Sequence, residues 1–326
     1  MRAWTFVAMV VVLACVFGAI APPYVHRYHL PLQSAAGIYS CFLLLLVLSI
    51  APGMAVTRQW IQARLTGPRQ LALLPLLWCL PYLLYAAGTR DLRSVALLRL
   101  LAVSVPLPLI YRLLPVRDLA RFAWQDLAVA AWLIAALLAH QLAEIWTVPA
   151  NLDFMGRLFL VCIASWSWVF LRPVPGLGYE FSLSAKILRL AAWNFLLFAV
   201  IAIPASLALH FTQWNPLHTG VLAFCTSFLE IFLFIALLEE LFFRGFLQTL
   251  ISKNLRSART GQILISCVFG LFHILHAPFP NWRYVLLATV AGWFYGSAFA
   301  NSGSLMASAL THAMVDTVWR TFFSKS

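Results

Sequence analysis

Charged residues are scarce along this chain. Only 10% of its 326 residues are Asp, Glu, Lys or Arg, whereas 63% are hydrophobic and the mean hydropathy is +0.90. A soluble domain needs much more polar surface than this composition provides. Apolar runs of roughly 17 to 25 residues recur from end to end, and each is long enough to cross a hydrocarbon core as a helix. We therefore expect an all-α, polytopic integral membrane helical bundle.

These runs are longer than the strands of a membrane β-barrel and do not alternate between apolar and polar residues. The apolar runs predict about ten or eleven transmembrane helices. We place them at residues 3–21, 35–56, 71–88, 95–114, 127–147, 155–171, 188–209, 220–250, 261–277, 283–300 and 304–323. The run at 95–114 contains Arg99, Pro106 and Pro108, so it is either a span or a broken, interfacial segment.

One stretch interrupts the helical pattern more strongly than any other. Residues 172–180 contain two prolines and two glycines and cannot continue a helix. The sequence thus predicts two membrane halves, an N-terminal bundle at 1–178 with no assigned role and a C-terminal domain at 179–326.

Acidic residues are the rarer charged type, with 10 Asp and Glu against 22 Lys and Arg and a net charge of +12. The basic residues are spread over every second membrane-flanking loop, so they fit a positive-inside distribution and not a nucleic-acid surface. We expect a cytoplasmic N-terminus and the lipid bilayer, not nucleic acid, as the surroundings of the chain. Because the sequence shows no soluble extension, we expect the protein in a bacterial inner membrane.

The six cysteines show neither disulfide pairing nor zinc-ligand spacing and fall inside the predicted spans. We interpret them as small apolar residues.

Three polar patterns interrupt the apolar C-terminal spans. An ionisable side chain at the centre of a membrane helix costs about 2.5 to 3.5 kcal/mol on insertion scales. Several of them in neighbouring spans indicate a buried reaction centre. The patterns are Glu239-Glu240-x-x-x-Arg244, Phe269-x-x-x-His273 and His312-x-x-x-Asp316.

The spacing within the first and third patterns predicts local pairs. Glu240 and Arg244 are four residues apart and share a helix face, whereas Glu239 points about 100 degrees away. His312 and Asp316 have the same spacing, so the carboxylate can orient the imidazole. Each pattern alone also has a structural interpretation, because Arg244 can snorkel to the interface with both acids and a buried histidine can simply be hydrogen-bonded.

Together the patterns predict peptide hydrolysis without a covalent intermediate. Glu239 would activate water, His273 would position it or carry its proton, and His312 with Asp316 would stabilise the oxyanion. No Gly-x-Ser-x-Gly or Cys/His signature supports nucleophilic catalysis in this region. The residue types would also suit a divalent metal, but no His-Glu-x-x-His signature is present, so we favour a mechanism without a cofactor.

The three motifs, in this order and with Gly303-Ser304-Leu305 upstream of the last, resemble those of the CAAX protease and bacteriocin-processing (CPBP or Abi) family, which includes the Ras-converting endopeptidases. The resemblance covers roughly residues 185–326. It implies a helical intramembrane endopeptidase in which Glu239 and His273 activate water. It also implies that Glu240 and Arg244 support the site, as does Phe269 in the second motif, and that His312 and the residue at 316 contact the oxyanion.

One position departs from the family pattern. The last motif often ends in asparagine, which can donate a hydrogen bond to an oxyanion, and an ionised Asp316 cannot. Asp316 is then protonated, orients His312 or binds a metal.

The expected partners are membrane-anchored protein or peptide substrates cleaved close to the bilayer. The alternatives are a non-catalytic binding or immunity protein of the same fold, or a cation-relay transporter. A relay predicts ionisable residues in both halves of the chain, whereas here they concentrate in one.

Overall fold

The computed structural model describes residues 3–148, 152–217 and 220–325. These residues are helical for most of their length, which confirms the all-α class. The chain divides into two compact units. Unit 1 comprises Met1–Leu119 and Ala123–Pro173, and unit 2 comprises Ala120–Phe122 and Val174–Ser326.

Unit 1 is built from eight α-helices within the described residues. They are α1 (Ala3–Arg27), α2 (Leu32–Ile50), α3 (Ala55–Arg64), α4 (Arg69–Thr89), α5 (Ser94–Ser104), α6 (Pro106–Leu113), α7 (Trp124–Leu138) and α8 (Phe154–Trp166), with a 3-10 turn η1 (Ala51–Gly53) and a π-helical end η2 (Ser167–Leu171). Helix α2 packs against both α4 and α8. At the α2–α4 contact, a Cβ on Gly37 would stand 2.6 Å from the Cα of Gly88, so only glycine permits this approach.

A fully buried ion pair fixes the end of unit 1. Arg172 Nε and Nη2 each lie 2.9 Å from an Asp126 carboxylate oxygen, and Arg172 Nη1 donates to the carbonyl of Leu119. Tyr111 donates its hydroxyl proton to Asp126 at 3.2 Å. Both carboxylate oxygens of Asp126 are paired, so we interpret this cluster as a structural ion pair that holds Arg172 in place.

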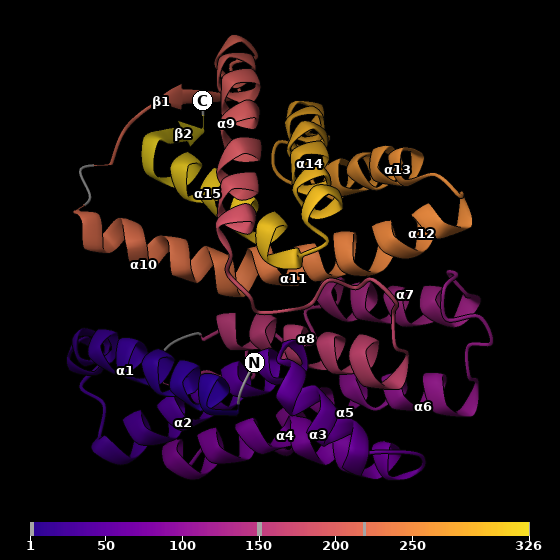
Figure 1. Ribbon diagram of the computed structural model, residues 1–326. Coiled ribbons are helices and arrows are strands. Elements are labelled where there is room, and N and C mark those ends of the chain that lie inside the picture. Colours follow the sequence, from indigo (N-terminus) through magenta and orange to yellow (C-terminus); the bar gives the residue numbers. More distant parts are fainter. Residues whose placement is uncertain (1–2, 149–151, 218–219, 326) are drawn as a thin grey trace. The chain divides into compact units, whose positions relative to one another are not determined.

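Unit 2 holds all three polar motifs. Its elements are α9 (Ala185–Ala208), α10 (Val221–Ile231), η3 (Phe232–Ala236), α11 (Leu237–Glu240), η4 (Leu241–Gln248), α12 (Thr249–Asn254), α13 (Ala258–Leu271), α14 (Trp282–Ser302) and α15 (Leu305–Phe322), together with the strands β1 (Thr212–Trp214) and β2 (Phe323–Lys325). In Figure 1 the stretch from α10 to α12 (orange) crosses the unit as one long helical run. Helices α9 and α14 stand steeply to it, and both pack against α15. The two strands pair antiparallel, with Thr212 opposite Lys325.

Polar side chains cap the helices of unit 2. The side-chain oxygens of Ser184, Ser257, Asn281 and Ser304 accept hydrogen bonds from the first-turn amides of α9, α13, α14 and α15. These caps satisfy amides that the helix itself leaves open, so they fix where each helix begins. Gly303 ends α14 with a φ of 69°, the left-handed conformation that glycine adopts without strain.

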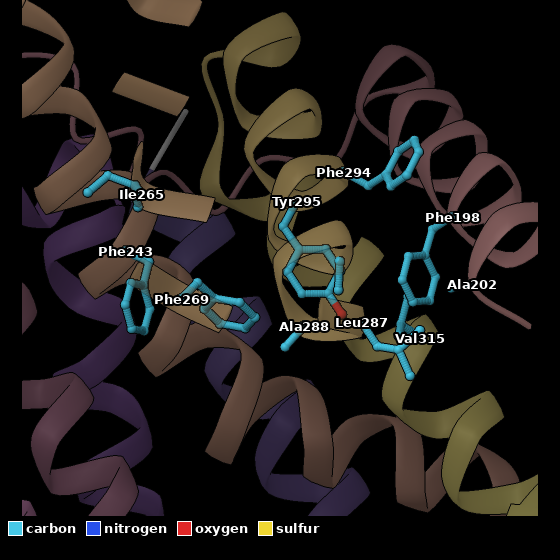
Figure 2. Close-up of a cluster of buried hydrophobic side chains, with 11 residues drawn as sticks. Phe198, Ala202, Phe243, Ile265, Phe269, Leu287, Ala288, Phe294, Tyr295 and Val315 are labelled. Atoms are coloured by element: carbon cyan, nitrogen blue, oxygen red, sulfur yellow. The ribbon is translucent and has the colours of Figure 1, made fainter. Parts of the chain in front are cut away.

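An apolar cluster joins the helices of unit 2 (Figure 2). Its buried members come from α9, η4, α13, α14 and α15 and are Phe198, Ala202, Phe243, Ile265, Phe269, Leu287, Ala288, Ala291, Phe294, Tyr295 and Val315. Phe269 and Tyr295 also contact the polar motifs. The core therefore holds the site in place as well as stabilising the unit.

Seven helical stretches of the described residues are long and apolar enough to cross a membrane. They are Trp4–Arg27, Leu32–Gly53, Arg69–Thr89, Ser94–Leu113, Phe154–Leu171, Ala185–Ala208 and Val221–Asn254. Helices α7 and α13 are apolar but shorter. Helices α14 and α15, which we also predicted as spans, are outside this set.

Several predicted boundaries differ from the observed ones. The helix expected over 127–147 ends at Leu138, and the run at 95–114 is divided between α5 and α6 at Val105, just before Pro106. Helix α3 lies where a loop was expected. The stretch at 220–250 is not one regular α-helix, because π-helical segments flank α11 on both sides.

Candidate active site

Glu240 is the centre of a buried polar network in unit 2. Its side chain is fully buried. Oε2 lies 3.2 Å from Arg244 Nε and accepts a hydrogen bond from Ser308 Oγ, while Oε1 lies 2.9 Å from His312 Nδ1. Glu240 thus connects the first motif with the third.

Arg244 is buried to the same extent as its partner. Besides the ion pair with Glu240, its Nη2 donates to the carbonyl of Gly292 at 2.9 Å. The guanidinium lies 4.6 Å from the ring centroid of Phe269, which adds a cation–π contact. A Cβ on Gly292 would come within 3.2 Å of Arg244 Nη2, so glycine leaves the room that this bond needs. Arg244 is therefore held in the interior and does not snorkel.

Glu239 has a different environment from its neighbour. Its side chain is one-third exposed (33%), and its closest ion contact is His312 Nε2 at 3.9 Å from Oε2, beyond hydrogen-bond distance. The four-residue α11 carries both glutamates between two π-helical segments. Such departures from regular α-helix are frequent at functional sites.

His312 is held by contacts on both ring nitrogens and by two aromatic rings. Since a carboxylate can only accept, Nδ1 donates its proton to Glu240. Nε2 then faces Asp316 Oδ2 at 3.4 Å and Glu239 Oε2 at 3.9 Å. The ring of Tyr295 stacks on the imidazole with a centroid distance of 4.4 Å and an interplanar angle of 14°, and Phe269 meets it edge-on at 6.0 Å. Together these contacts fix the orientation of His312.

His273 does not lie inside a helix, contrary to our prediction. Helix α13 ends at Leu271, and His273 is in the following turn. Its Nδ1 is 2.9 Å from the carbonyl oxygen of Phe269 and donates to it, which leaves Nε2 available. The ring contacts those of Phe269, His276 and Tyr284 at centroid distances of 4.9, 5.5 and 4.6 Å.

Asp316 lies one turn after His312 on α15, with its side chain 37% exposed. It contacts His312 through the nitrogen that Glu240 does not use. Asp316 and Glu239 are thus the two accessible carboxylates of the cluster, while Glu240 is sealed inside.

Within the described ranges, no group of three or more His, Cys, Asp or Glu side chains is placed so that it could hold a metal ion. The ligand types remain those that a divalent cation accepts.

Sequence reasoning missed three residues of this network. Ser308 precedes His312 by four residues on the same helix, and this spacing was a signal that could have identified it. Tyr295 and Gly292 lie on α14, outside all three motifs, and no pattern in the sequence pointed to them.

Residues 190–318 match the family model described as Rce1-like: Type II CAAX prenyl endopeptidase Rce1-like. This region is an Rce1-like domain of the CAAX protease family. No curated protein and no solved structure gave a significant match to the chain. Every residue of the three motifs lies inside the Rce1-like domain. The family implies CAAX endopeptidase activity in general terms, and the apolar helices make the protein an integral membrane protein.

Proposed function

We propose that the Rce1-like domain hydrolyses a peptide bond of membrane-anchored proteins, with a water molecule activated by Glu239 as the nucleophile. The contrast between two adjacent glutamates carries this proposal. Glu240 is fully buried and engaged by Arg244, Ser308 and His312. Glu239 is one-third exposed and has no hydrogen-bonding partner among the described residues. The Glu240 carboxylate therefore holds neighbouring helices together, whereas the Glu239 carboxylate is available to water.

The proposed reaction balances within the site. Glu239 takes a proton from water as the water oxygen attacks the carbonyl carbon of the scissile peptide. The resulting oxyanion collapses, the C–N bond breaks, and the proton passes to the leaving amine. His273, with Nδ1 bound to Phe269 and Nε2 available, would position the water or relay this proton.

On the proposed oxyanion side, Asp316 acts through His312. An ionised Asp316 has no proton to donate, and its Oδ2 lies 3.4 Å from His312 Nε2. Since Nδ1 already donates to Glu240, His312 acts in this proposal as an imidazolium, whose Nε2–H faces Asp316 and is the ring donor left for an oxyanion. We therefore assign Asp316 to the orientation of His312 and the oxyanion contact to the imidazole. No cofactor takes part in this proposal.

The substrate chemistry follows from the family and the membrane setting. A prenylated CAAX protein is the substrate class named by the family description, and lipid-anchored chains reach a site placed among membrane helices. We also propose a bacterial inner membrane with the N-terminus in the cytoplasm, on the basis of the basic loops. A reporter fused to the N-terminus would test this orientation.

The decisive experiment compares the termini of membrane proteins in native cells that carry the wild-type chain, Glu239→Gln or Glu230→Gln at equal expression. Glu230 is a matched control because it is an exposed glutamate on α10 paired with Arg320. Precursors that remain uncleaved only with Glu239→Gln would establish proteolysis and identify the substrates. Identical termini in all three strains would reject it in favour of a binding or immunity protein.

A further inference from the structure

The side chain of Tyr284, in the first turn of α14, lies against His273 although it belongs to none of the three motifs. Its ring centroid is 4.6 Å from that of His273 and 5.0 Å from that of His276. It also contacts the ring of Phe211 at 5.2 Å. These three aromatic neighbours hold the phenol beside the proposed catalytic histidine.

Asn281 fixes Tyr284 relative to His273. Its Oδ1 accepts a hydrogen bond from the amide of Tyr284 at 3.0 Å and so caps α14. Its own amide donates to the carbonyl of Ile274 at 3.1 Å, and its Nδ2 donates to the carbonyl of Ala277 at 3.3 Å. Asn281 is only 7% exposed, so water competes little for these bonds. One buried side chain therefore ties the turn that carries His273 to the start of the helix that carries Tyr284.

The hydroxyl group of Tyr284 is available as a donor. It makes no hydrogen bond to any residue that the structure describes. The carboxylates of Asp316 and Glu239 both act on it electrostatically, so the hydroxyl lies on the side of the site that holds the two accessible acids. A phenol is protonated at neutral pH and can donate one hydrogen bond, whereas an ionised carboxylate can only accept.

Asp316 creates the need for such a donor. The oxyanion that forms when water attacks a peptide carbonyl is repelled by an ionised carboxylate nearby. His312 offers one ring donor to this oxyanion, and that nitrogen is already 3.4 Å from Asp316 Oδ2. Oxyanion sites use preorganised donors aimed at the developing charge. A second, neutral donor would therefore offset the repulsion that Asp316 introduces.

Tyr295 is less suited to this role than Tyr284. Tyr295 is 1% exposed and lies nearly parallel to the His312 ring, so a substrate oxygen has almost no access to it. Tyr284 is only partly buried where it packs against the apolar cluster of unit 2. A substrate oxygen can therefore approach Tyr284 without displacing its neighbours.

We propose that the Tyr284 hydroxyl donates a hydrogen bond to the oxyanion of the tetrahedral intermediate, as a second donor beside His312 Nε2. The phenol keeps its proton throughout, so the proton balance of the reaction is unchanged. This inference rests on the proposed proteolysis, because it requires water activated by Glu239 to attack a peptide carbonyl.

The first test measures cleavage of a prenylated CAAX peptide by the purified full-length Tyr284→Phe variant in detergent. Phenylalanine keeps the ring beside His273 and removes only the hydroxyl. We expect kcat to fall at least about 100-fold while KM stays within about twofold of wild type. The matched control, Tyr82→Phe, removes a hydroxyl from unit 1 and should keep the wild-type kcat. A Tyr284→Phe variant with the kcat of the control would overturn the proposal.

The second test separates binding of the oxyanion from binding of the substrate. In a phosphinate analogue of the same peptide, a charged oxygen stands in for the oxyanion. Tyr284→Phe should weaken inhibition by this analogue at least about tenfold more than it changes KM for the peptide, since the hydroxyl acts on the tetrahedral state. Equal weakening of both ligands would assign Tyr284 a structural role and overturn the proposal.

Glu239→Gln in the same assay distinguishes the two proposals. If Glu239→Gln cleaves the peptide at the wild-type rate, the proposed hydrolysis is wrong and the role of Tyr284 is wrong with it. If Glu239→Gln is inactive and Tyr284→Phe is fully active, the inference on Tyr284 alone is wrong. Loss of turnover in both variants, with an unchanged Tm for Tyr284→Phe, is the expected result.

Discussion

Glu240 Oε1 lies 2.9 Å from His312 Nδ1, and this contact joins two motifs that are 72 residues apart. The other carboxylate oxygen of Glu240 pairs with Arg244 at 3.2 Å. One buried carboxylate thus balances a cation on its own helix and orients an imidazole on α15. The adjacent Glu239 takes no part in this arrangement beyond a 3.9 Å approach to His312.

This difference predicts opposite behaviour for two neighbouring substitutions. Glu240→Gln leaves Arg244 as an unpaired buried charge and should destabilise the protein by about 3–5 kcal/mol. Glu239→Gln changes a partly exposed group and should alter stability by no more than about 1 kcal/mol while lowering turnover by at least about 100-fold. The two variants are compared by their unfolding in detergent and by their cleavage of a prenylated CAAX peptide. Equal destabilisation by both variants would contradict the division of roles.

Ser308→Ala tests the donor that the motifs did not reveal. Ser308 gives its proton to Glu240, and bonds to charged groups contribute about 1.5–3 kcal/mol. We expect the free energy of unfolding to fall by this amount. We also expect a lower kcat, since Glu240 would be less firmly held against His312. Ser266→Ala is the control, because Ser266 is a buried serine that donates to the carbonyl of Gln262 in its own helix. Equal effects of the two substitutions would assign Ser308 a packing role only.

Gly292→Ala probes the close approach of α14 to Arg244. The added methyl group would stand 3.2 Å from Arg244 Nη2, from Phe269 Cδ1 and from Ser266 Cα. Overpacking of this kind costs about 1–3 kcal/mol, and we expect kcat to fall with it because Arg244 would shift against Glu240. Gly220→Ala should have little effect, since a Cβ there meets nothing within 4 Å. Thermal unfolding of both variants in one detergent provides the comparison.

The sequence predicted the membrane class and the two local pairs for a common physical reason. Both depend on helix geometry, because apolar runs must be helical in lipid and residues four apart share a face. The pairs Glu240–Arg244 and His312–Asp316 are indeed in contact.

What the sequence could not show depends on packing between helices. The bond from His312 to Glu240 and the stacking of Tyr295 require α11, α14 and α15 to converge. The end of α13 at Leu271 was also missed, because the apolar run continues to residue 277 although the helix does not. Periodicity alone carries no information on either feature.

Asp316 offers the sharpest test of the chemistry, because the family often has asparagine at this position. Asp316→Asn keeps an oxygen that accepts from His312 Nε2, so we expect turnover within about tenfold of wild type, whereas Asp316→Leu should lose at least about 100-fold. The same assay after treatment with a strong chelator addresses the metal alternative. If Asp316 orients His312, chelation leaves the wild-type rate unchanged. If Asp316 is a metal ligand, chelation abolishes turnover, and added divalent metal restores turnover in the wild-type chain but not in Asp316→Leu. That result would show that Asp316 acts through a metal and not by orienting His312.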